Sequence, residues 1–273
     1  MQHDKSRQLA HWCRIFGWPV NLYALLSKMK YLCNPRILPT NTSPSDLSEL
    51  ARRTEEFSRF ATEIQLDIAD GVFAPVVSWP YQSGQWQELE RLAQGEKLPL
   101  SETVAYEAHL MAQEPLEIGV LLAKAGCQRL IFHIEATGIM SAREMTRAWK
   151  DAGAKEVGVS LLVDTPLEAI DDVIGFVDVV QLMSIPKIGA QGQPFDERTL
   201  SRVEELHAKY PDMMVAVDGG ISESNIELLV RAGANRLCVG SAISNAMNKE
   251  AAFATLFERA MRGCAPQSVS EVL

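Results

Sequence analysis

The sequence lacks a long apolar run and a regular spacing of cysteines. No stretch of its 273 residues approaches the roughly 18 consecutive apolar residues that cross a bilayer. The apolar segment over residues 12–26 is interrupted by Gly17 and Pro19, so a signal peptide is not expected. No CxxC pair occurs, which excludes a zinc-finger or disulfide framework and predicts reduced cysteines in a cytoplasmic protein. The five cysteines are Cys13, Cys33, Cys127, Cys238 and Cys264.

Basic charge is also scarce. The chain carries 26 lysine and arginine residues against 35 aspartate and glutamate residues, which gives a formal net charge of −9. This balance argues against nucleic acid or an anionic membrane surface as a partner. A local basic pocket for a phosphorylated metabolite is compatible with it. We therefore expect a small anionic substrate, with no nucleic-acid or membrane partner.

From residue 35 onward, the sequence contains an alternation of short apolar runs and amphipathic segments. Eight runs are predicted to be strands, with helical patterns between them. Eight such units closing on themselves give an α/β fold of the (β/α)8 TIM-barrel type, for which about 240 residues is a usual length. An open doubly wound sheet is the alternative, but its GxGxxG signature is absent. The predicted strands cover residues 36–38, 63–67, 105–111, 129–133, 156–163, 177–183, 213–218 and 236–239.

The ends of the chain fall outside this alternation. Residues 1–32 are expected to form an N-terminal extension, either an added helix or a start-site artefact, because Met29 begins a natural start in MKYLCNPRILP. The barrel is predicted over residues 33–263, and residues 264–273 are expected to be a flexible tail. The segment over residues 78–103 is longer and more aromatic than a plain connection requires, which favours a flap or a dimer contact.

Capping residues mark several predicted helix ends. The segment from Ser43 to Asp46 combines capping side chains with a proline in the first turn, and Thr165 with Pro166 gives a similar start. Three helices are predicted to end at glycines, which supply the left-handed conformation that a β-carbon opposes. These glycines are Gly126, Gly153 and Gly233.

The stretch from Met214 to Asn245 predicts a strand, helix, strand unit that suits an anion. One apolar run ends in Asp218-Gly219-Gly220, a helix is expected from about Glu223 to Ala232, and the next run ends in Gly240-Ser241. Unobstructed backbone N–H groups and a helix N-terminus can converge on a phosphate at such sites. Asp218 occupies the last strand position, where barrels of this type present catalytic side chains.

Polar side chains at three strand ends predict a metal centre. Gln65 and Asp67 share one face of the second strand because side chains alternate, while His109 lies on the third strand and Asp218 on the seventh. Such oxygen and nitrogen donors can hold a divalent metal with open positions. Two aspartates also provide a base and an acid for inverting a carbon beside a carbonyl.

Structural roles compete with these functional ones. An aspartate at a strand end is often a cap, His109 alone is compatible with a core histidine, and Met111 and Met183 are compatible with core packing. His133, followed by Glu135, belongs either to the pocket or to a loop support. After the sixth strand, Gly189, Gly192 and Pro194 predict a loop that can close over a ligand, in which Lys187 is either a phosphate ligand or a solvated side chain.

Together these motifs resemble the ribulose-phosphate 3-epimerase family, from Pro35 to about Leu256. IQLDIADGVFAP is similar to the family's HxDxMDGxFVPN, and EAHLM to its DxHLM. IFHIEAT, VDVVQLMSIPKIGAQGQPF, VAVDGGI and AGANRLCVGSAI follow in the family order. Six motifs in this order are specific for the superfamily.

The resemblance implies a barrel enzyme of the pentose phosphate pathway that interconverts ribulose 5-phosphate and xylulose 5-phosphate. One divalent metal ion, Zn, Fe, Mn or Co, is the expected cofactor, and a homo-oligomer is the expected assembly. Asp67 and Asp218 are implied as the acid/base pair, and the implied metal ligands are Asp67, His109, Asp218 and Gln65. The expected substrate-binding and phosphate-binding residues are Gly192, Gln193, Gly219, Gly220, Gly240, Ser241, Met111 and Met183.

Several positions depart from the family pattern. Gln65 replaces the first metal-ligand histidine, and a glutamine oxygen binds transition metals less firmly than imidazole does. Arg36 replaces the serine of the PSIL segment, which predicts a positive charge near the substrate mouth, and Ala69 replaces the methionine of the MDG motif. These changes favour a divergent branch that acts on a different phosphosugar, such as a hexulose phosphate, or has weakened activity.

Two other functions stay open. One is a non-catalytic phosphosugar-binding protein that kept the phosphate site. The other is a lyase or decarboxylase on the same barrel, whose relatives carry a DxKxxD motif after a strand. The corresponding segment here runs from Asp67 to Asp70 without the lysine, which counts against that function.

Overall fold

The computed structural model describes residues 33–137, 139–189 and 192–264. The extension expected over residues 1–32 and nearly all of the tail expected over 264–273 lie outside the described residues. The account that follows concerns the unit that begins at Pro35.

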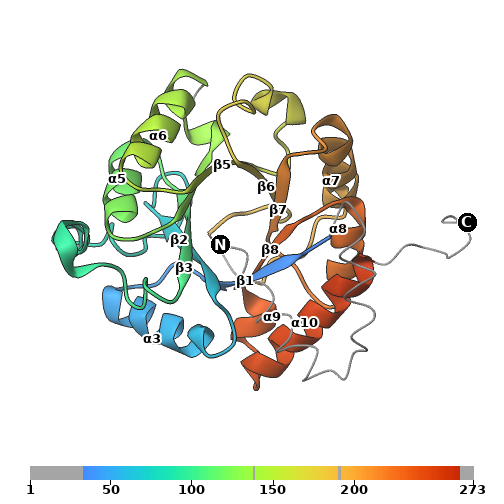
Figure 1. Cartoon of the computed structure of the whole chain (residues 1–273), viewed down its shortest axis with the longest axis horizontal. Coiled ribbons are helices and arrows are strands. Elements are labelled where there is room, and N and C mark those ends of the chain that lie inside the picture. Colours follow the sequence, from blue (N-terminus) through green and yellow to red (C-terminus); the bar gives the residue numbers. More distant parts are fainter. Residues whose placement is uncertain (1–32, 138, 190–191, 265–273) are drawn as a thin grey trace, which may run out of the picture. The chain divides into compact units, whose positions relative to one another are not determined.

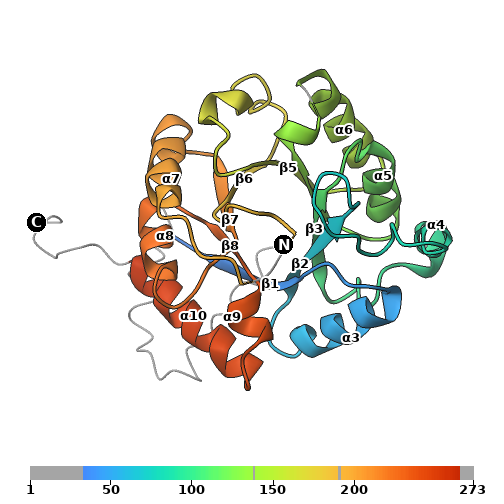
Figure 2. The same ribbon diagram turned by 180° about the vertical axis from the view of Figure 1, so that it is seen from behind.

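Eight parallel strands close into a barrel in the order in which they occur in the chain, and β8 pairs with β1 (Figures 1 and 2). The predicted (β/α)8 barrel is therefore confirmed. Most of the predicted strand bounds agree with the observed ones, although β1 runs three residues further than expected. The strands are β1 Arg36–Asn41, β2 Glu63–Ala69, β3 Ala105–Met111, β4 Arg129–His133, β5 Glu156–Leu161, β6 Val179–Met183, β7 Met214–Asp218 and β8 Arg236–Val239.

The helices surround the barrel on its outside (Figure 1). They are α3 Leu47–Ser58, α4 Trp86–Arg91, α5 Leu116–Lys124, α6 Ile139–Asp151, α7 Arg198–Lys209, α8 Ile226–Ala232, α9 Ser241–Ser244 and α10 Lys249–Gly263. Shorter helical turns are the π-helical η1 Leu92–Glu96 and the 3-10 turns η2 Ile134–Ala136 and η3 Leu167–Ile170. Their apolar faces cover strands whose residues are almost all buried.

The predicted caps account for four helix ends. Asp46 opens α3, where its side chain accepts a hydrogen bond of 2.8 Å from the backbone N–H of Glu49. Gly126, Gly153 and Gly233 all have positive φ, as expected for glycines that end helices. The start expected at Thr165 and Pro166 yields only η3, because two aspartates and Gly175 follow, and these residues have low helix propensity.

The aromatic segment over residues 78–103 forms α4 and η1. Trp79 is fully buried, and its indole N–H donates to Glu88 at 3.1 Å. Its backbone N–H donates to Pro44, so this segment is tied to the connection after β1. A contact of this segment with a second copy of the chain stays a prediction.

Ion pairs fill the end of the barrel where the strands begin. Arg236 is fully buried and pairs with Glu107 and Glu156, and Arg36 pairs with Glu63. The predicted position of Arg36 beside the substrate mouth is wrong. As the first residue of a parallel strand, it lies at the end of the barrel opposite the strands' carboxyl ends.

The structure also tests the predictions about the cysteines and about membrane-spanning segments. Cys127 and Cys238 are free and buried, as expected, whereas Cys33 and Cys264 are disulfide-bonded, so the expectation of reduced cysteines is wrong for these two. Within the described ranges, the helices are too short or too polar to cross a membrane.

Candidate active site

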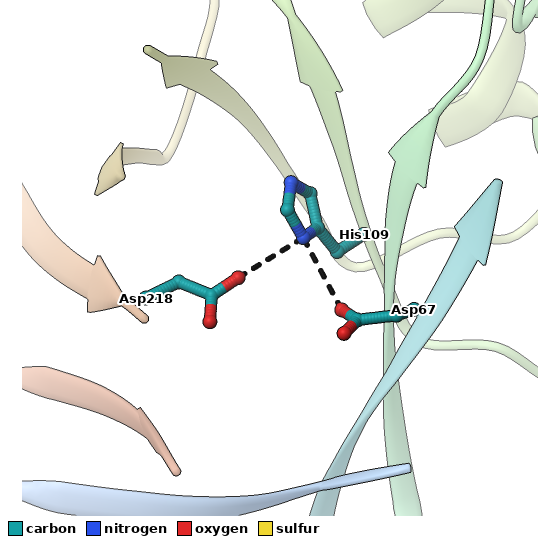
Figure 3. Close-up of side chains that lie close together, drawn as sticks. All are labelled: Asp67, His109 and Asp218. Atoms are coloured by element: carbon teal, nitrogen blue, oxygen red, sulfur yellow. Dashed lines mark hydrogen bonds and ion pairs between the residues drawn. The ribbon is translucent and has the colours of Figure 1, made fainter. Parts of the chain in front are cut away.

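Three side chains converge at the carboxyl ends of the strands (Figure 3). Nδ1 of His109 lies 3.3 Å from Oδ1 of Asp67 and 3.1 Å from Oδ2 of Asp218. One candidate ligand atom from each residue lies within 4.8 Å of the others. His109 is fully buried, and the aspartates are 7% and 8% exposed. The sequence-predicted cluster therefore exists as one compact group.

Strand register explains the convergence. Asp67 on β2 is paired directly with His109 on β3, so their inward side chains are neighbours. Asp218 is the last residue of β7, which places its carboxyl group across the barrel mouth from these two (Figure 3). The alternation of side chains along β2 and β3 fixes this geometry without any special loop conformation.

Burial and mutual contact set the charges of the cluster. Burial raises the pKa of Asp67 to about 6, the hydrogen bond from His109 opposes that shift, and the charge of Asp218 adds to it. Burial lowers the pKa of His109, but hydrogen bonds with Asp218 and Asp67 outweigh it and raise the pKa to about 10. The cluster thus favours a positive charge between two carboxylates.

The donor set fits a divalent metal ion. A single imidazole nitrogen carries one proton, yet Nδ1 of His109 faces two carboxylate oxygens. A cation bound by one nitrogen and two carboxylate oxygens would satisfy all three groups, and imidazole with carboxylate is a common ligand set for Zn, Fe, Mn and Co. The buried Asp67, His109 and Asp218 group could therefore bind a metal.

A hydrogen-bonded chain supports the other side of the His109 ring. Its Nε2 lies 2.8 Å from Nε2 of His133, whose Nδ1 lies 3.3 Å from Oε2 of Glu135. Glu135 in turn accepts hydrogen bonds from the backbone N–H of Leu162 and the hydroxyl of Thr165. Burial lowers the pKa of His133 to about 4, opposed by the hydrogen bond with Glu135. His133 thus contacts the cluster through His109 but does not line the cavity, and through Glu135 it is also linked to the connection after β5.

A cavity that is open to solvent lies over the cluster. Besides the three cluster residues, the predicted residues that line it are Gly192, Gln193, Gly219, Gly220, Gly240, Ser241, Met111 and Met183. The sequence analysis missed Thr40, Thr42, Ile185 and Ile221, and named Gly189 only as part of a loop. Thr40 is a polar residue near the end of β1, so a longer first strand would have revealed it.

Glycine is required where the cavity wall turns. Gly219 and Gly220 have φ of 111° and 59°. A β-carbon on Gly219 would lie 2.8 Å from Ile185, and one on Gly220 would lie 2.8 Å from the Cα of Phe195. The backbone can therefore approach a ligand closely here, although α8 begins only at Ile226, later than expected.

Two predicted residues lie elsewhere. Gln65 is fully buried and lines no part of the cavity, and its amide is hydrogen-bonded to Thr40, Gln181 and Glu107. Lys187 is exposed in the loop after β6 and does not line the cavity either.

Comparisons with known sequences all point to the same family. The model of the ribulose-phosphate 3 epimerase family matches residues 37–244. The cytoplasmic isoform of ribulose-phosphate 3-epimerase from Oryza sativa subsp. japonica is 31% identical, with 77% of this chain and 88% of the rice protein covered. Ribulose-phosphate 3-epimerase from Aquifex aeolicus is 32% identical, with 69% and 80% covered. The chloroplastic ribulose-5-phosphate-3-epimerase of Arabidopsis thaliana is 31% identical, with 81% and 74% covered.

Solved structures with the same fold are more distant in sequence. The 3-hexulose-6-phosphate synthase of Salmonella typhimurium has a TM-score of 0.62 at 15% identity, with 84% of this chain and 99% of that one covered. The 3-keto-L-gulonate-6-phosphate decarboxylase of Vibrio cholerae has a TM-score of 0.62 at 12% identity, with 85% and 100% covered. At these identities the likeness concerns the barrel alone.

Proposed function

Because the chain belongs to the ribulose-phosphate 3 epimerase family, we propose that it inverts C3 of a ketose phosphate. The substrate is ribulose 5-phosphate, in exchange with xylulose 5-phosphate, or a related sugar phosphate. The observation that carries the proposal is the pair of aspartates from β2 and β7 that face one cavity with His109 between them.

Two carboxylates suit this reaction because a proton must be removed from one face of C3 and added to the opposite face. One aspartate removes the proton from C3 on one face, and the electrons of the broken C–H bond move toward the C2 carbonyl oxygen. The other aspartate then donates a proton to C3 on the opposite face, which leaves the epimer. The proposed acid/base pair is Asp67 and Asp218. The raised pKa of Asp67 is suited to a group that must both accept and donate a proton near neutral pH.

Asp67, His109 and Asp218 are the proposed holders of a divalent metal ion, either Zn, Fe, Mn or Co. When bound, the metal supplies positive charge where negative charge develops on the oxygens beside C3. The chain's own contribution is to hold the three groups on adjacent or facing strands and to bury most of their surface.

The proposed phosphate site is the glycine-rich part of the cavity lining. Backbone and short side chains of Gly192, Gln193, Gly219, Gly220, Gly240 and Ser241 gather there. Met111 and Met183, each 2% exposed, form an apolar floor with Ile185 under the proposed sugar position. Such a floor holds the carbon chain between the reacting end and the phosphate.

A cytoplasmic location and a homo-oligomeric assembly belong to the same proposal. The relative from rice is named a cytoplasmic isoform, whereas the relative from Arabidopsis is chloroplastic.

The alternative lyase chemistry needs a DxKxxD motif, and counted from Asp67 its second aspartate position is Val72. Asp70 accepts hydrogen bonds from the backbone N–H groups of Val72, Phe73 and Gln113. Its carboxyl group is therefore committed to shaping the loop after β2, and the motif's lysine position is Ala69.

Deuterium exchange at C3 of ribulose 5-phosphate in D2O, followed by proton NMR on metal-replete protein, tests the proposal. Wild-type protein is expected to exchange this proton, while Asp67→Asn and Asp218→Asn lose exchange and Asp164→Asn, an exposed aspartate, retains it. Absence of exchange with any C5 or C6 ketose phosphate would refute an epimerase. Phosphosugar binding by calorimetry without exchange would instead support the non-catalytic binding protein.

A further inference from the structure

Gln65 occupies the inward face of β2, two residues before Asp67. It is fully buried, and both polar atoms of its amide have partners. Its oxygen accepts a hydrogen bond of 3.2 Å from the hydroxyl of Thr40. Its nitrogen donates to Oε1 of Gln181 at 3.0 Å and to Oε1 of Glu107 at 3.3 Å.

The chemistry of these partners fixes which way the amide points. Glu107 is ion-paired with the buried Arg236, and a carboxylate offers only acceptors. The NH2 group of Gln65 must therefore face Glu107, and its oxygen must face Thr40. Reversing the amide would place oxygen against the Glu107 carboxylate in a buried site. The one atom of Gln65 that could ligate a cation is thus already engaged.

The same constraint passes on to Gln181. Because Oε1 of Gln181 accepts from Gln65, its own NH2 group faces the cluster, where it lies 3.4 Å from Oδ2 of Asp218. This is the oxygen of Asp218 that also faces His109 at 3.1 Å. Gln65 therefore acts on Asp218 indirectly, through Gln181.

We propose that Gln65 is a positioning residue rather than a metal ligand. It orients Gln181 so that an N–H donor faces Asp218, and the metal is held by three protein ligands, Asp67, His109 and Asp218. This inference rests on the proposed metal-dependent epimerase.

Gln65→Glu separates the two roles by the sign of its effect. If Gln65 were a ligand, the carboxylate would keep an oxygen, add charge and tighten metal binding by about tenfold or more. If Gln65 is instead a positioning residue, Gln65→Glu places a carboxylate against Glu107 and removes the donor to Gln181. Metal binding is then unchanged or weaker, and the rate of C3 exchange falls.

A double-substitution cycle identifies the route of action. Gln65→Met keeps the side-chain volume and removes the amide. We expect it to leave metal content near one ion per chain and to lower kcat. In a Gln181→Met background, the same substitution should have little further effect, because the orientation it controls is already lost. A merely structural role would make the two losses independent. Gln128→Met, outside the cavity, is the matched control and should leave both quantities unchanged.

The experiment measures metal content by elemental analysis, metal affinity by chelator competition and kcat for C3 exchange, with circular dichroism as the check on folding. Wild type and His109→Ala are measured in the same series. A wild type that binds metal, with loss in His109→Ala, supports the proposed function independently of Gln65. Tighter binding in Gln65→Glu, or loss of metal in folded Gln65→Met, overturns the inference. A wild type that binds no metal overturns both. If Gln65→Met does not fold, Gln65→Glu decides alone.

Discussion

Replacing His133 by phenylalanine tests the proposed metal centre without changing a proposed ligand. A cation held at Nδ1 of His109 requires that nitrogen to be unprotonated, so the ring's proton must lie on Nε2. Nε2 lies 2.8 Å from Nε2 of His133, which must therefore accept it. His133 then carries its own proton on Nδ1, facing Glu135 at 3.3 Å. Each proton position follows from the one before.

The expected magnitude comes from the bond that phenylalanine cannot accept. His133→Phe keeps a ring of similar size but leaves the Nε2–H of His109 buried without a partner, a cost of about 1–3 kcal/mol. Removal of a hydrogen-bond partner behind a metal-ligating histidine typically lowers metal affinity about 10- to 100-fold. We expect a loss in that range, measured by competition with a chromophoric chelator at fixed pH.

Two variants of Glu135 act as controls. Glu135→Gln keeps an oxygen that can accept from His133, so its effect on metal affinity should be smaller than that of His133→Phe. Glu135→Leu removes the acceptor, and its loss of metal affinity should lie between those of Glu135→Gln and His133→Phe. If folded His133→Phe binds metal as tightly as wild type, the proton assignments above are wrong. If that variant does not fold, the comparison between the two Glu135 variants carries the test.

Three other predictions concern the reaction, the proposed phosphate site and the end of the barrel where the strands begin. Asp218→Asn should lower kcat about 10²- to 10⁴-fold in C3 exchange, since it removes one proton-transfer group. Gly220→Ala should raise KM for a phosphorylated ketose about tenfold with a smaller change in kcat, because its φ is 59° and the new β-carbon would meet Phe195. Glu156→Gln should lower Tm at pH 7 and flatten the fall of Tm below about pH 4.5, the ordinary pKa of glutamate.

The sign of the Glu156 prediction follows from its environment. Burial raises its pKa, but the charge of Arg236 and the hydrogen bond with it outweigh burial, so the net pKa is lowered on folding. A lowered pKa contributes stability above the unfolded value and loses it as pH falls through the folded value. An unchanged acid transition in Glu156→Gln would contradict this. Near-wild-type exchange by Asp218→Asn, or an unchanged KM in Gly220→Ala, would contradict the other two.

Local patterns predicted the fold because each of them has one structural solution. Apolar runs of strand length that alternate with amphipathic segments specify βα units, and the glycines at 126, 153 and 233 end helices by their φ alone. The cluster of Asp67, His109 and Asp218 followed from strand ends and the alternation of side chains. No partner from another part of the chain had to be known for these inferences.

Position along a strand was harder to interpret than the face of a strand. Gln65 and Asp67 share a face, but two residues of strand separate them by roughly 6.6 Å along the barrel, so Gln65 belongs to the layer below the cluster. Its partners Glu107 and Gln181 lie 42 and 116 residues away in sequence, and their amide and carboxylate orientations decide its role. The position of Arg36 was misjudged for the same reason, because it is the first residue of a strand whose other end lies at the site.

The layers of the barrel connect its stability to its proposed chemistry. At the base, Arg236 holds Glu107 by a buried ion pair, and Glu107 dictates the amide orientation of Gln65. Gln65 in turn orients Gln181, whose donor faces Asp218. Each link in this chain is a buried polar group with a single favourable orientation, so an error at one link passes to the next. The proposed phosphate site, in contrast, consists largely of glycine backbone. A member of this family can therefore change a side chain in the layer below the cluster, as at Gln65, while its proposed phosphate site stays the same.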